Sequence, residues 1–358
     1  MDIRIYELAV IILLGLLCSN YGRKGKTFYV WSVISMLLLE SGLRSYYVGN
    51  DTIFYYNTFN DMKITSWSDT FCLFADAYIR GTTRDPGYSL LVKILQIFVS
   101  DFTSFLLIIA VIYFIPLGYV VNKYTGRTLE CIFAFTLYVA LFRVIALSGV
   151  RQQIAIGFSI IALIQILKGK NLLAVVFIVL GFFIHTSCAL CFAWFGLKMI
   201  PHKWFNKVTY VSILFVPVMY TMSGAIMLWL ASFIKNDYYA SYGESEMAGG
   251  ANTYFLLMEL LAIGCFLCLR KVTNNNTIHN FLTNLPMVIL LTPLIMLNGS
   301  MIRMGQYFTL YLLVILPMAV RVKLPYRNMQ NITLCSMIGI LLYMVLQSNV
   351  LYYFFWER

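Results

Sequence analysis

The stretch Ser148–Gln153, with the sequence SGVRQQ, joins two apolar runs of the chain, Cys131–Leu147 and Ile154–Leu167. Each run is long enough, or nearly so, to cross a bilayer as a helix. Arg151 lies between them and is expensive to place near lipid. Two interpretations follow. The side chain is either an anchor that reaches a lipid phosphate at the membrane surface or an anion-binding arginine, held where a lipid diphosphate could lie.

The composition indicates an integral membrane protein. Of the 358 residues, 61% are hydrophobic and 11% are charged, whereas a soluble protein carries about 25% charged residues. Apolar runs recur from residue 3 to residue 355, so we expect one integral membrane domain over 1–358. The run Leu8–Leu17 has no basic flank and no small-x-small cleavage site, which favours a retained first span.

We predict an all-α, polytopic transmembrane helix bundle with about twelve spans and one short re-entrant or interfacial helix. The short helix is assigned to Gly87–Val99, which is too short to cross and contains Lys93. The predicted spans are Ile3–Ser19, Phe28–Leu43, Phe105–Val121, Cys131–Leu147, Val150–Leu167, Leu172–Ile184, Thr186–Ile200, Val208–Met222, Tyr254–Leu269, Phe281–Leu297, Met304–Val320 and Ile332–Tyr352.

Basic residues predict the orientation, because cytoplasmic loops carry an excess of Lys and Arg. Six loop clusters hold 15 of the 26 Lys and Arg: Arg23/Lys24/Lys26, Lys123/Arg127, Lys168/Lys170, Lys198/Lys203/Lys207, Arg270/Lys271 and Arg321/Lys323/Arg327. They account for the positive charge, so nucleic acid is not expected as a partner. The outer face then receives the long loops at about 44–104 and 223–253, and long loops are usually functional.

The first outer loop contains a candidate catalytic acid, Asp51. This residue either caps a helix that starts at Thr52 or is a carboxylate that binds a sugar hydroxyl or accepts a proton. Just before the loop, Glu40 and Arg44 are four residues apart on one predicted helical face, which predicts an ion pair between them.

A second acid, Asp85, lies in the segment Arg80–Tyr88 and precedes Pro86, a pattern that suits the start of a helix. Arg80 and Arg84 have aromatic neighbours and describe a carbohydrate or phosphate site, because guanidinium groups bind phosphate through two hydrogen bonds. The alternative is that both arginines are solvated surface charges.

His185 lies between two short apolar runs at the predicted outer side. It is either a hydrogen-bonded core residue or a group that takes a proton from a hydroxyl, since histidine titrates near neutrality. Arg303 is predicted at the same level as Arg151, so the two favour a converging anion site. Arg143 would add to the field there. No cysteine or histidine spacing fits a zinc site, so we expect no metal and no cofactor.

The ordered set of these motifs resembles the EpsG family, the Wzy-like polymerases of bacterial exopolysaccharide, capsule or O-antigen. The resemblance covers about residues 40–310. In this family Glu often stands where this chain has Asp85, so the acid is kept with a shorter reach. The motifs are Arg44 with Gly49-x-Asp51-Thr52 and Tyr55, Asp85-Pro-Gly-Tyr88, Ser148-Gly-x-Arg151-Gln152, Phe183-x-His185-x-Ser187 and Arg303-x3-Tyr307-Phe308.

The resemblance implies a metal-independent, GT-C-like glycosyltransferase in the bacterial plasma (inner) membrane. It would move a growing chain from undecaprenyl diphosphate onto a new lipid-linked repeat unit at the outer side. The expected partners are this lipid-linked oligosaccharide, membrane lipids and a chain-length regulator protein. The catalytic candidates are His185, Asp51 and Asp85, and the substrate-binding candidates are Arg151, Arg303, Arg44, Arg84, Gln152, Tyr307 and Arg80.

Two other functions are compatible with parts of the pattern. A transporter or flippase of the same lipid-linked glycan would also need arginines that face a cavity, but it should show internal repeats and charges deep in several helices. We find no internal repeat, and the candidate charges cluster at one predicted face. A related membrane ligase or acyltransferase is the third possibility.

Overall fold

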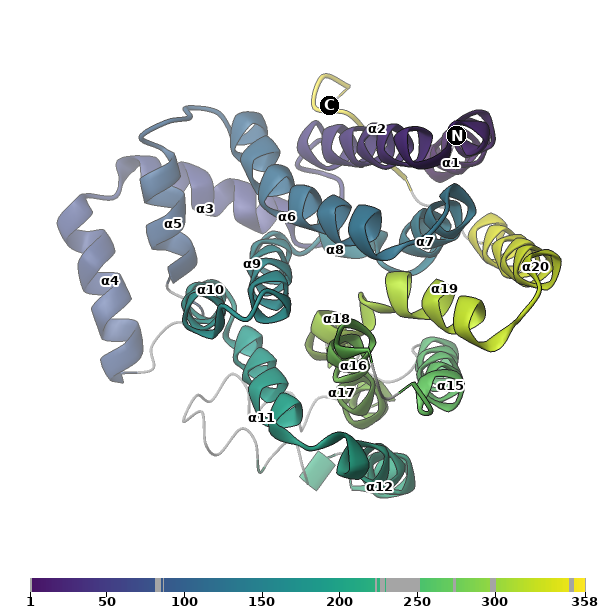
Figure 1. The fold of residues 1–358 in the computed structure, drawn as a ribbon. Coiled ribbons are helices and arrows are strands. Elements are labelled where there is room, and N and C mark those ends of the chain that lie inside the picture. The colour runs from purple at the N-terminus through teal and green to yellow at the C-terminus, as the bar shows by residue number, and fades with distance from the viewer. Residues whose placement is uncertain are drawn as a thin grey trace. The chain divides into compact units, whose positions relative to one another are not determined.

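A computed structural model describes residues 2–80, 85, 87–222, 224–225, 229, 252–272, 275–296, 301–347 and 351–357. Over these residues the regular structure is helical, as predicted, and Arg44 and Phe354 form an isolated β-bridge (Figure 1). The helices are α1 (Ile3–Cys18), η1 (Ser19–Tyr21), α2 (Gly22–Gly42), α3 (Thr52–Ile64), α4 (Trp67–Arg80), α5 (Gly87–Leu95), α6 (Phe102–Tyr124), α7 (Thr128–Leu141), α8 (Arg143–Leu147), α9 (Val150–Leu167), α10 (Asn171–Ile184), η2 (Thr186–Phe192), α11 (Ala193–Met199), α12 (His202–Thr221), α15 (Asn252–Leu269), α16 (Asn276–Leu282), α17 (Asn284–Leu291), η3 (Thr292–Met296), α18 (Ile302–Thr309), α19 (Leu312–Lys323) and α20 (Arg327–Leu346).

The chain divides into two compact units. The first comprises Met1–Ala75, Asp85–Thr186 and Leu324–Arg358, and the second comprises Asp76–Arg84 and Ser187–Lys323. In the second unit, α17 packs against α12, α15 and α18, and α19 packs against α15. The candidate chemistry described below belongs to the first unit.

In the first unit, α1 and α2 form an antiparallel pair. The chain turns between them at Gly22, whose φ of 56° lies in the left-handed region that favours glycine. Glu7 near the start of α1 and Glu40 near the end of α2 contact the same side chain, Arg143, so these two helix ends lie together. Helix α2 packs against α6, α6 against α9, and α9 against α10, while α7 contacts α1 and α20 (Figure 1).

The apolar run Cys131–Leu147 was predicted to form one span, but in the structure it is divided into two helices. Helix α7 ends at Leu141, and a separate short helix, α8, begins at Arg143. Nη2 of Arg143 lies 3.1 Å from Oε1 of Glu7 and also contacts Oε1 of Glu40, with all three side chains buried. A charge can be buried there because it is paired, so the break in the helix coincides with an ion-paired arginine.

The predicted ion pair between Glu40 and Arg44 is wrong. Helix α2 ends at Gly42, so Arg44 has left the helical face on which the four-residue spacing would apply. Glu40 pairs with Arg143 instead, and Arg44 donates to the backbone carbonyl and the hydroxyl of Ser41.

By length and composition, five helical segments of the described chain are able to cross a membrane, or six if the bent pair α18–α19 counts as one span. The count of twelve is therefore not confirmed, because several predicted spans are short or broken. Four shorter apolar helices are Thr128–Leu141, Asn171–Ile184, Thr186–Met199 and Thr253–Leu269, and the five longer segments are Ile3–Gly42, Phe102–Tyr124, Val150–Leu167, Asn276–Ile295 and Arg327–Leu346.

Helix α9 separates two charged ends of the first unit. Its 18 residues span about 27 Å at a rise of about 1.5 Å per residue, which is close to the hydrocarbon thickness of a bilayer. Arg151 lies in its first turn. Lys168 follows its last residue, with Nζ 5.5 Å from the ring centre of Tyr119 near the end of α6. Lys168 therefore lies at the same end of the unit as Lys123, which also contacts Tyr119.

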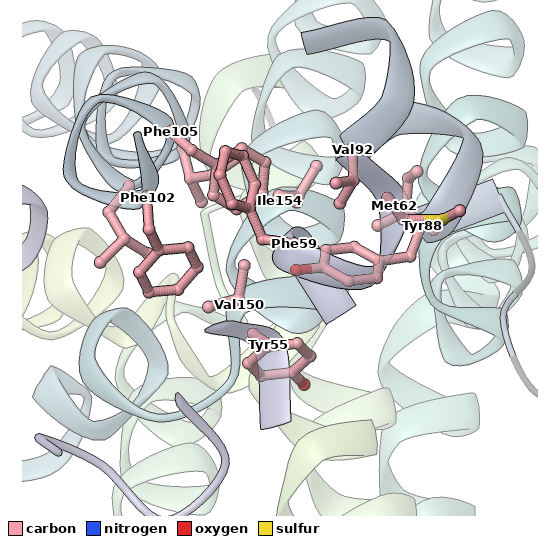
Figure 2. Packing of buried hydrophobic residues seen from close by; sticks show 12 residues of the cluster. Tyr55, Phe59, Met62, Tyr88, Val92, Phe102, Phe105, Val150 and Ile154 are labelled. Carbon is pink, nitrogen blue, oxygen red and sulfur yellow. The ribbon is translucent and has the colours of Figure 1, made fainter. Parts of the chain in front are cut away.

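An apolar core supports the end that carries Arg151. Residues from α3, α5, α6, α9 and α10 pack together there (Figure 2). They are Tyr55, Phe59, Met62, Tyr88, Val92, Phe102, Phe105, Leu106, Ile109, Val150, Ile154 and Ile184. Burial of several aromatic rings holds the short helices α3 and α5 against the longer ones.

Candidate functional site

Two residues that are far apart in the sequence, Arg151 and Thr186, contact the carboxylate of Asp85. Oδ1 accepts hydrogen bonds from the backbone N–H of Thr186 at 2.9 Å and from its hydroxyl at 2.8 Å. Oδ2 lies 3.5 Å from Nη1 of Arg151, an ion pair in which the Asp85 side chain is fully buried and the Arg151 side chain is 14% exposed. The carboxylate therefore links the start of α9 to the residue that follows His185.

The electrostatics keep this carboxylate charged. Burial alone would raise the pKa of Asp85, but His185, Arg151 and the hydrogen bonds from Thr186 outweigh it, so the pKa lies below the ordinary value of 3.8. At neutral pH Asp85 is an anion held between two potential cations. Such an anion stabilises a protonated His185 and restricts the position of Arg151.

Two glycines bring the surrounding segments close enough to form this cluster. Gly49 has a φ of 86°, and a Cβ there would lie 2.1 Å from the carbonyl oxygen of Leu147, just before α9. A Cβ on Gly87 would lie 2.4 Å from the carbonyl oxygen of Phe183, at the end of α10. Neither contact is open to a larger residue without movement of the backbone.

The backbone of Asp85 is itself in an unusual conformation. Its φ is 51°, in the left-handed region that non-glycine residues rarely adopt. Among non-glycine residues, Asp and Asn tolerate this region best. Strained residues of this kind are concentrated at functional sites, so the observation favours a functional role for Asp85.

Arg151 also packs against three aromatic rings. Its guanidinium carbon lies 5.6 Å from the ring centre of Tyr55, 5.9 Å from that of Phe54 and 6.0 Å from that of Tyr88. Cation–π contacts of this length stabilise a guanidinium that has lost part of its hydration. The side chain is thus held by an acid and by rings, which differs from an arginine that extends freely to lipid phosphate.

Arg44 provides a second, deeper cation. It is 1% exposed, and within the described part of the chain its Nε and Nη2 atoms have no hydrogen-bond partner. Burial lowers the pKa of Arg44 to about 10, so it remains charged at neutral pH. Burial also raises the pKa of Tyr88, and Arg151 and Arg44 partly oppose that shift, which places both cations near the Tyr88 hydroxyl.

A cavity of about 760 Å³, within the usual size range of ligand pockets, opens at Ser148, in the turn before α9. Asp85, Arg151 and His185 are not among its described lining residues. Its lining includes Tyr46, Tyr47, Asn50 and Ser148, and it reaches Arg143. The Tyr46 ring stacks on the neighbouring Tyr56 at 4.4 Å. Aromatic faces with nearby amide and hydroxyl groups form the kind of surface on which sugars stack and hydrogen-bond.

The other predicted residues of the first unit lie nearby in the sequence and the fold. Asp51 occupies the N-cap position of α3, but its side chain makes no capping hydrogen bond. Thr52, the first residue of α3, donates its hydroxyl to the carbonyl of Leu147 at 3.1 Å. Gln152 is buried in α9, and His185, 5% exposed, ends α10.

The remaining candidates are not part of this cluster as described. Arg303 and Tyr307 belong to α18 in the second unit, where the Tyr307 hydroxyl accepts a hydrogen bond from Ser187 at 3.3 Å. A converging site of Arg151 and Arg303 stays a prediction. Arg84 and the side chain of Arg80 lie outside the described residues.

Sequence reasoning missed two parts of the site. Thr186 was not a candidate, although it supplies two of the hydrogen bonds to Asp85, and its position next to His185 was the only available signal. Arg143 was expected to add positive field, but Glu7 and Glu40 neutralise it. Among the described residues, no group of three or more His, Cys, Asp or Glu side chains is arranged to hold a metal ion.

The fold and the site define a helical membrane protein with a buried aspartate, arginine and histidine cluster and, in the same unit, a cavity lined by polar and aromatic residues. The chain belongs to the EpsG family, whose model matches residues 26–356. This is a family of Wzy-like polysaccharide polymerases, so the chain is a membrane protein of the polysaccharide polymerase type. Comparisons with curated proteins and with solved structures found no match.

Proposed function

We propose that the protein joins undecaprenyl-diphosphate-linked oligosaccharide repeat units into a longer surface polysaccharide on the outer side of the plasma membrane. The observation that carries the proposal is the buried cluster of Asp85, Arg151 and His185, in a chain of the EpsG family. The 760 Å³ cavity, which is lined by Ser148 at the turn before α9, is the proposed space for the sugars. The bundle is proposed to be GT-C-like, and the predicted twelve spans remain part of the proposal.

The reaction is a glycosyl transfer. A hydroxyl oxygen of the new repeat unit attacks the anomeric carbon of the growing chain, and the bond from that carbon to the lipid diphosphate breaks. The hydroxyl proton moves to His185, and the diphosphate leaves with the electron pair. Asp85 is too well stabilised as an anion to be the stronger base, so its proposed role is to orient His185 and to stabilise its protonated form.

Arg151 is proposed to bind the leaving diphosphate. Negative charge builds up on this group in the transition state, so a preorganised guanidinium stabilises the transition state more than the ground state. Of the two cations near Tyr88, Arg151 is the more accessible, because its side chain is 14% exposed whereas Arg44 is 1% exposed. Arg151 is therefore the residue that contacts the substrate in this proposal, and the buried Arg44 adds to the positive potential near Tyr88.

The orientation follows from the charge distribution. The end of α9 that carries Lys168 is proposed to face the cytoplasm, and the end that carries Arg151 is proposed to face outward. Cysteine placed at position 168 should react with a membrane-impermeant reagent only after the membrane is opened. The exposed Cys72 and Cys335 must first be replaced by serine. Labelling of position 168 in intact cells contradicts this orientation.

The central experiment is incubation of the purified protein with the lipid-linked repeat unit of its source strain. A ladder of chain lengths is expected, and its absence with an active, folded preparation contradicts the polymerase proposal. A flippase would move the intact substrate between vesicle leaflets without lengthening it. A ligase would yield a single addition to a different acceptor.

Arg151→Lys tests the role of the guanidinium, because lysine keeps the charge but cannot form two parallel hydrogen bonds. We expect a loss of rate of roughly a hundredfold to a thousandfold, the usual effect of removing one preorganised donor. Arg23→Lys, at an exposed position of the opposite end, is the matched control and should keep the wild-type rate. Normal chain growth with Arg151→Lys would return Arg151 to the role of a lipid anchor.

A further inference from the structure

At the end of the first unit opposite Arg151, five cationic side chains surround one cavity. The cavity has a volume of about 610 Å³. Its lining comes from three separate segments: the α1–α2 turn, the α6–α7 turn and the first turn of α20. The cationic lining residues are Arg23, Lys26, Lys123, Arg127 and Arg327.

The walls of this basic pocket are fixed to one another. Lys26 is buried, and its Nζ donates to the carbonyl oxygens of Asn122 at 2.6 Å and Thr125 at 2.8 Å, which ties the first two segments together. Arg127 donates to the side-chain oxygens of Asn331 at 2.8 Å and Gln330 at 3.0 Å, which ties the second segment to α20. The pocket is therefore held open by hydrogen bonds and does not depend on its ligand for its shape.

The remaining cations are not neutralised. Within the part of the chain that the structure describes, Arg23, Lys123 and Arg327 have no carboxylate partner, and none of the described lining residues is acidic. The one nearby acid, Glu130, lies 3.7 Å from Nε of Arg127. Like charges that are held together repel one another, so an anion placed among them is stabilised by all three.

The surroundings of the basic pocket indicate where such an anion comes from. Exposed apolar and aromatic side chains flank it in the sequence, with Tyr21 and Phe28 on the α1–α2 side and Tyr326 at the start of α20. Aromatic residues of this kind lie at the level of lipid headgroups, where their rings contact acyl chains and their polar atoms face water. An apolar rim can contact the acyl chains of a lipid, whereas it makes no favourable contact with a soluble anion.

We propose that the basic pocket binds the phosphate headgroup of an anionic phospholipid from the cytoplasmic leaflet. Basic pockets between helices on this side of a membrane are suited to such headgroups. The ligand is thus a phosphodiester with attached acyl chains. This inference does not depend on the polymerase reaction, because it concerns a separate cavity at the opposite end of the same helices.

The experiment uses the full-length protein in detergent and native mass spectrometry, with phosphatidylglycerol and phosphatidylcholine as the two probes. We expect preferential binding of phosphatidylglycerol. The double variant Arg23→Gln/Arg327→Gln removes two lining cations that have no carboxylate partner, and we expect its affinity to fall on the order of thirtyfold. Both side chains are exposed, so the variant should fold normally.

The matched control is Lys24→Gln/Lys170→Gln, which removes the same charge from two exposed positions of the same end that do not line the pocket. Its affinity should stay within about threefold of the wild type. An equal loss in both double variants would show general attraction by the basic surface and would overturn the proposal. Competition by inorganic phosphate or glycerol 1-phosphate at concentrations comparable to the lipid would identify a soluble anion as the ligand and would also overturn it.

Discussion

The two ends of the first unit differ in how many of their cations are buried or paired with a carboxylate. At one end, Arg151 and Arg143 are paired with buried carboxylates, and Arg44 is buried close to Tyr88. At the other end, Arg23 and Arg327 are exposed and have no carboxylate partner among the described residues. A buried charge is costly unless it is fixed in place, whereas exposed charges act through their sum. We therefore expect a single substitution to have a large effect at the first end, whereas at the second end several charges must be removed together to have one.

The largest effect is expected from Asp85→Asn. Asparagine keeps the shape and tolerates the left-handed backbone, but it leaves Arg151 partly buried without its anion. Removal of one partner of a buried pair costs about 3–5 kcal/mol, to be measured as the loss of free energy of unfolding in mixed micelles. The control is Asp101→Asn at the exposed N-cap of α6, where Asp and Asn are nearly equivalent. Equal stability of both variants would show that the Asp85–Arg151 pair contributes nothing.

His185→Ala should reduce the rate of chain growth by about a hundredfold to ten-thousandfold, the usual contribution of a general base. The pH dependence separates His185 from Asp85. Because the pKa of Asp85 lies below 3.8, its contribution to stability is complete above about pH 4 and is lost as the pH falls through the lowered pKa.

A fall in activity between about pH 7 and pH 5 must therefore come from a group other than Asp85, and histidine ordinarily titrates near pH 6.5. In Asp85→Asn this acid limb should move to lower pH, since no anion remains to stabilise a protonated His185. If the acid limb of the pH–rate profile is unchanged in Asp85→Asn, then Asp85 does not stabilise the protonated form of His185.

A smaller effect is expected from Gly49→Ala, about 2 kcal/mol or more of stability. The substitution combines an unfavourable positive φ with a clash against the carbonyl of Leu147. Gly169→Ala is the matched variant at the basic end, because Gly169 has a φ of 76° but no atom within 4 Å of an added Cβ. It should cost only the backbone strain, about 1 kcal/mol. Thermal unfolding of the two variants gives the comparison, and a cost for Gly169→Ala equal to that of Gly49→Ala would mean that close packing at Leu147 is unimportant.

The smallest effect is expected from Lys123→Gln at the basic end. Its Nζ donates to the Tyr119 hydroxyl at 3.1 Å, but the side chain is exposed. Stability should change by no more than about 0.5 kcal/mol, and chain growth should be normal. A loss comparable to that of Asp85→Asn would contradict the distinction between the two ends.

The sequence predicted those features of the site that depend on residues close to one another along the chain. The break at Gly149, the position of Arg151 in the first turn of a helix, and a helix that begins at Thr52 with Asp51 before it are all found in the structure. Each follows from turn residues and apolar runs of a few residues. The family was predicted from the same short motifs, and the family match confirms it.

Long-range pairing could not be predicted. Glu40 has a suitable partner four residues away, but it binds Arg143, which is 103 residues further along the chain. The pattern of apolar and charged residues does not indicate which arginine pairs with Glu40. A buried carboxylate can form an ion pair with any arginine that the fold brings near it. The same reason explains why Thr186 was missed and why the break at Phe142 inside an apolar run was unexpected.

The pairing of Arg143 with two early acids has a consequence for biosynthesis. Glu7 and Glu40 are translated 136 and 103 residues before their cation. At about 5–20 residues per second, the ribosome needs roughly 5 to 30 s to reach Arg143. During that interval the α1–α2 hairpin carries two acids without their partner, so they must be protonated or kept in water. Glu7 and Glu40 can therefore be buried in their ionised form only once α8 has brought Arg143 to them.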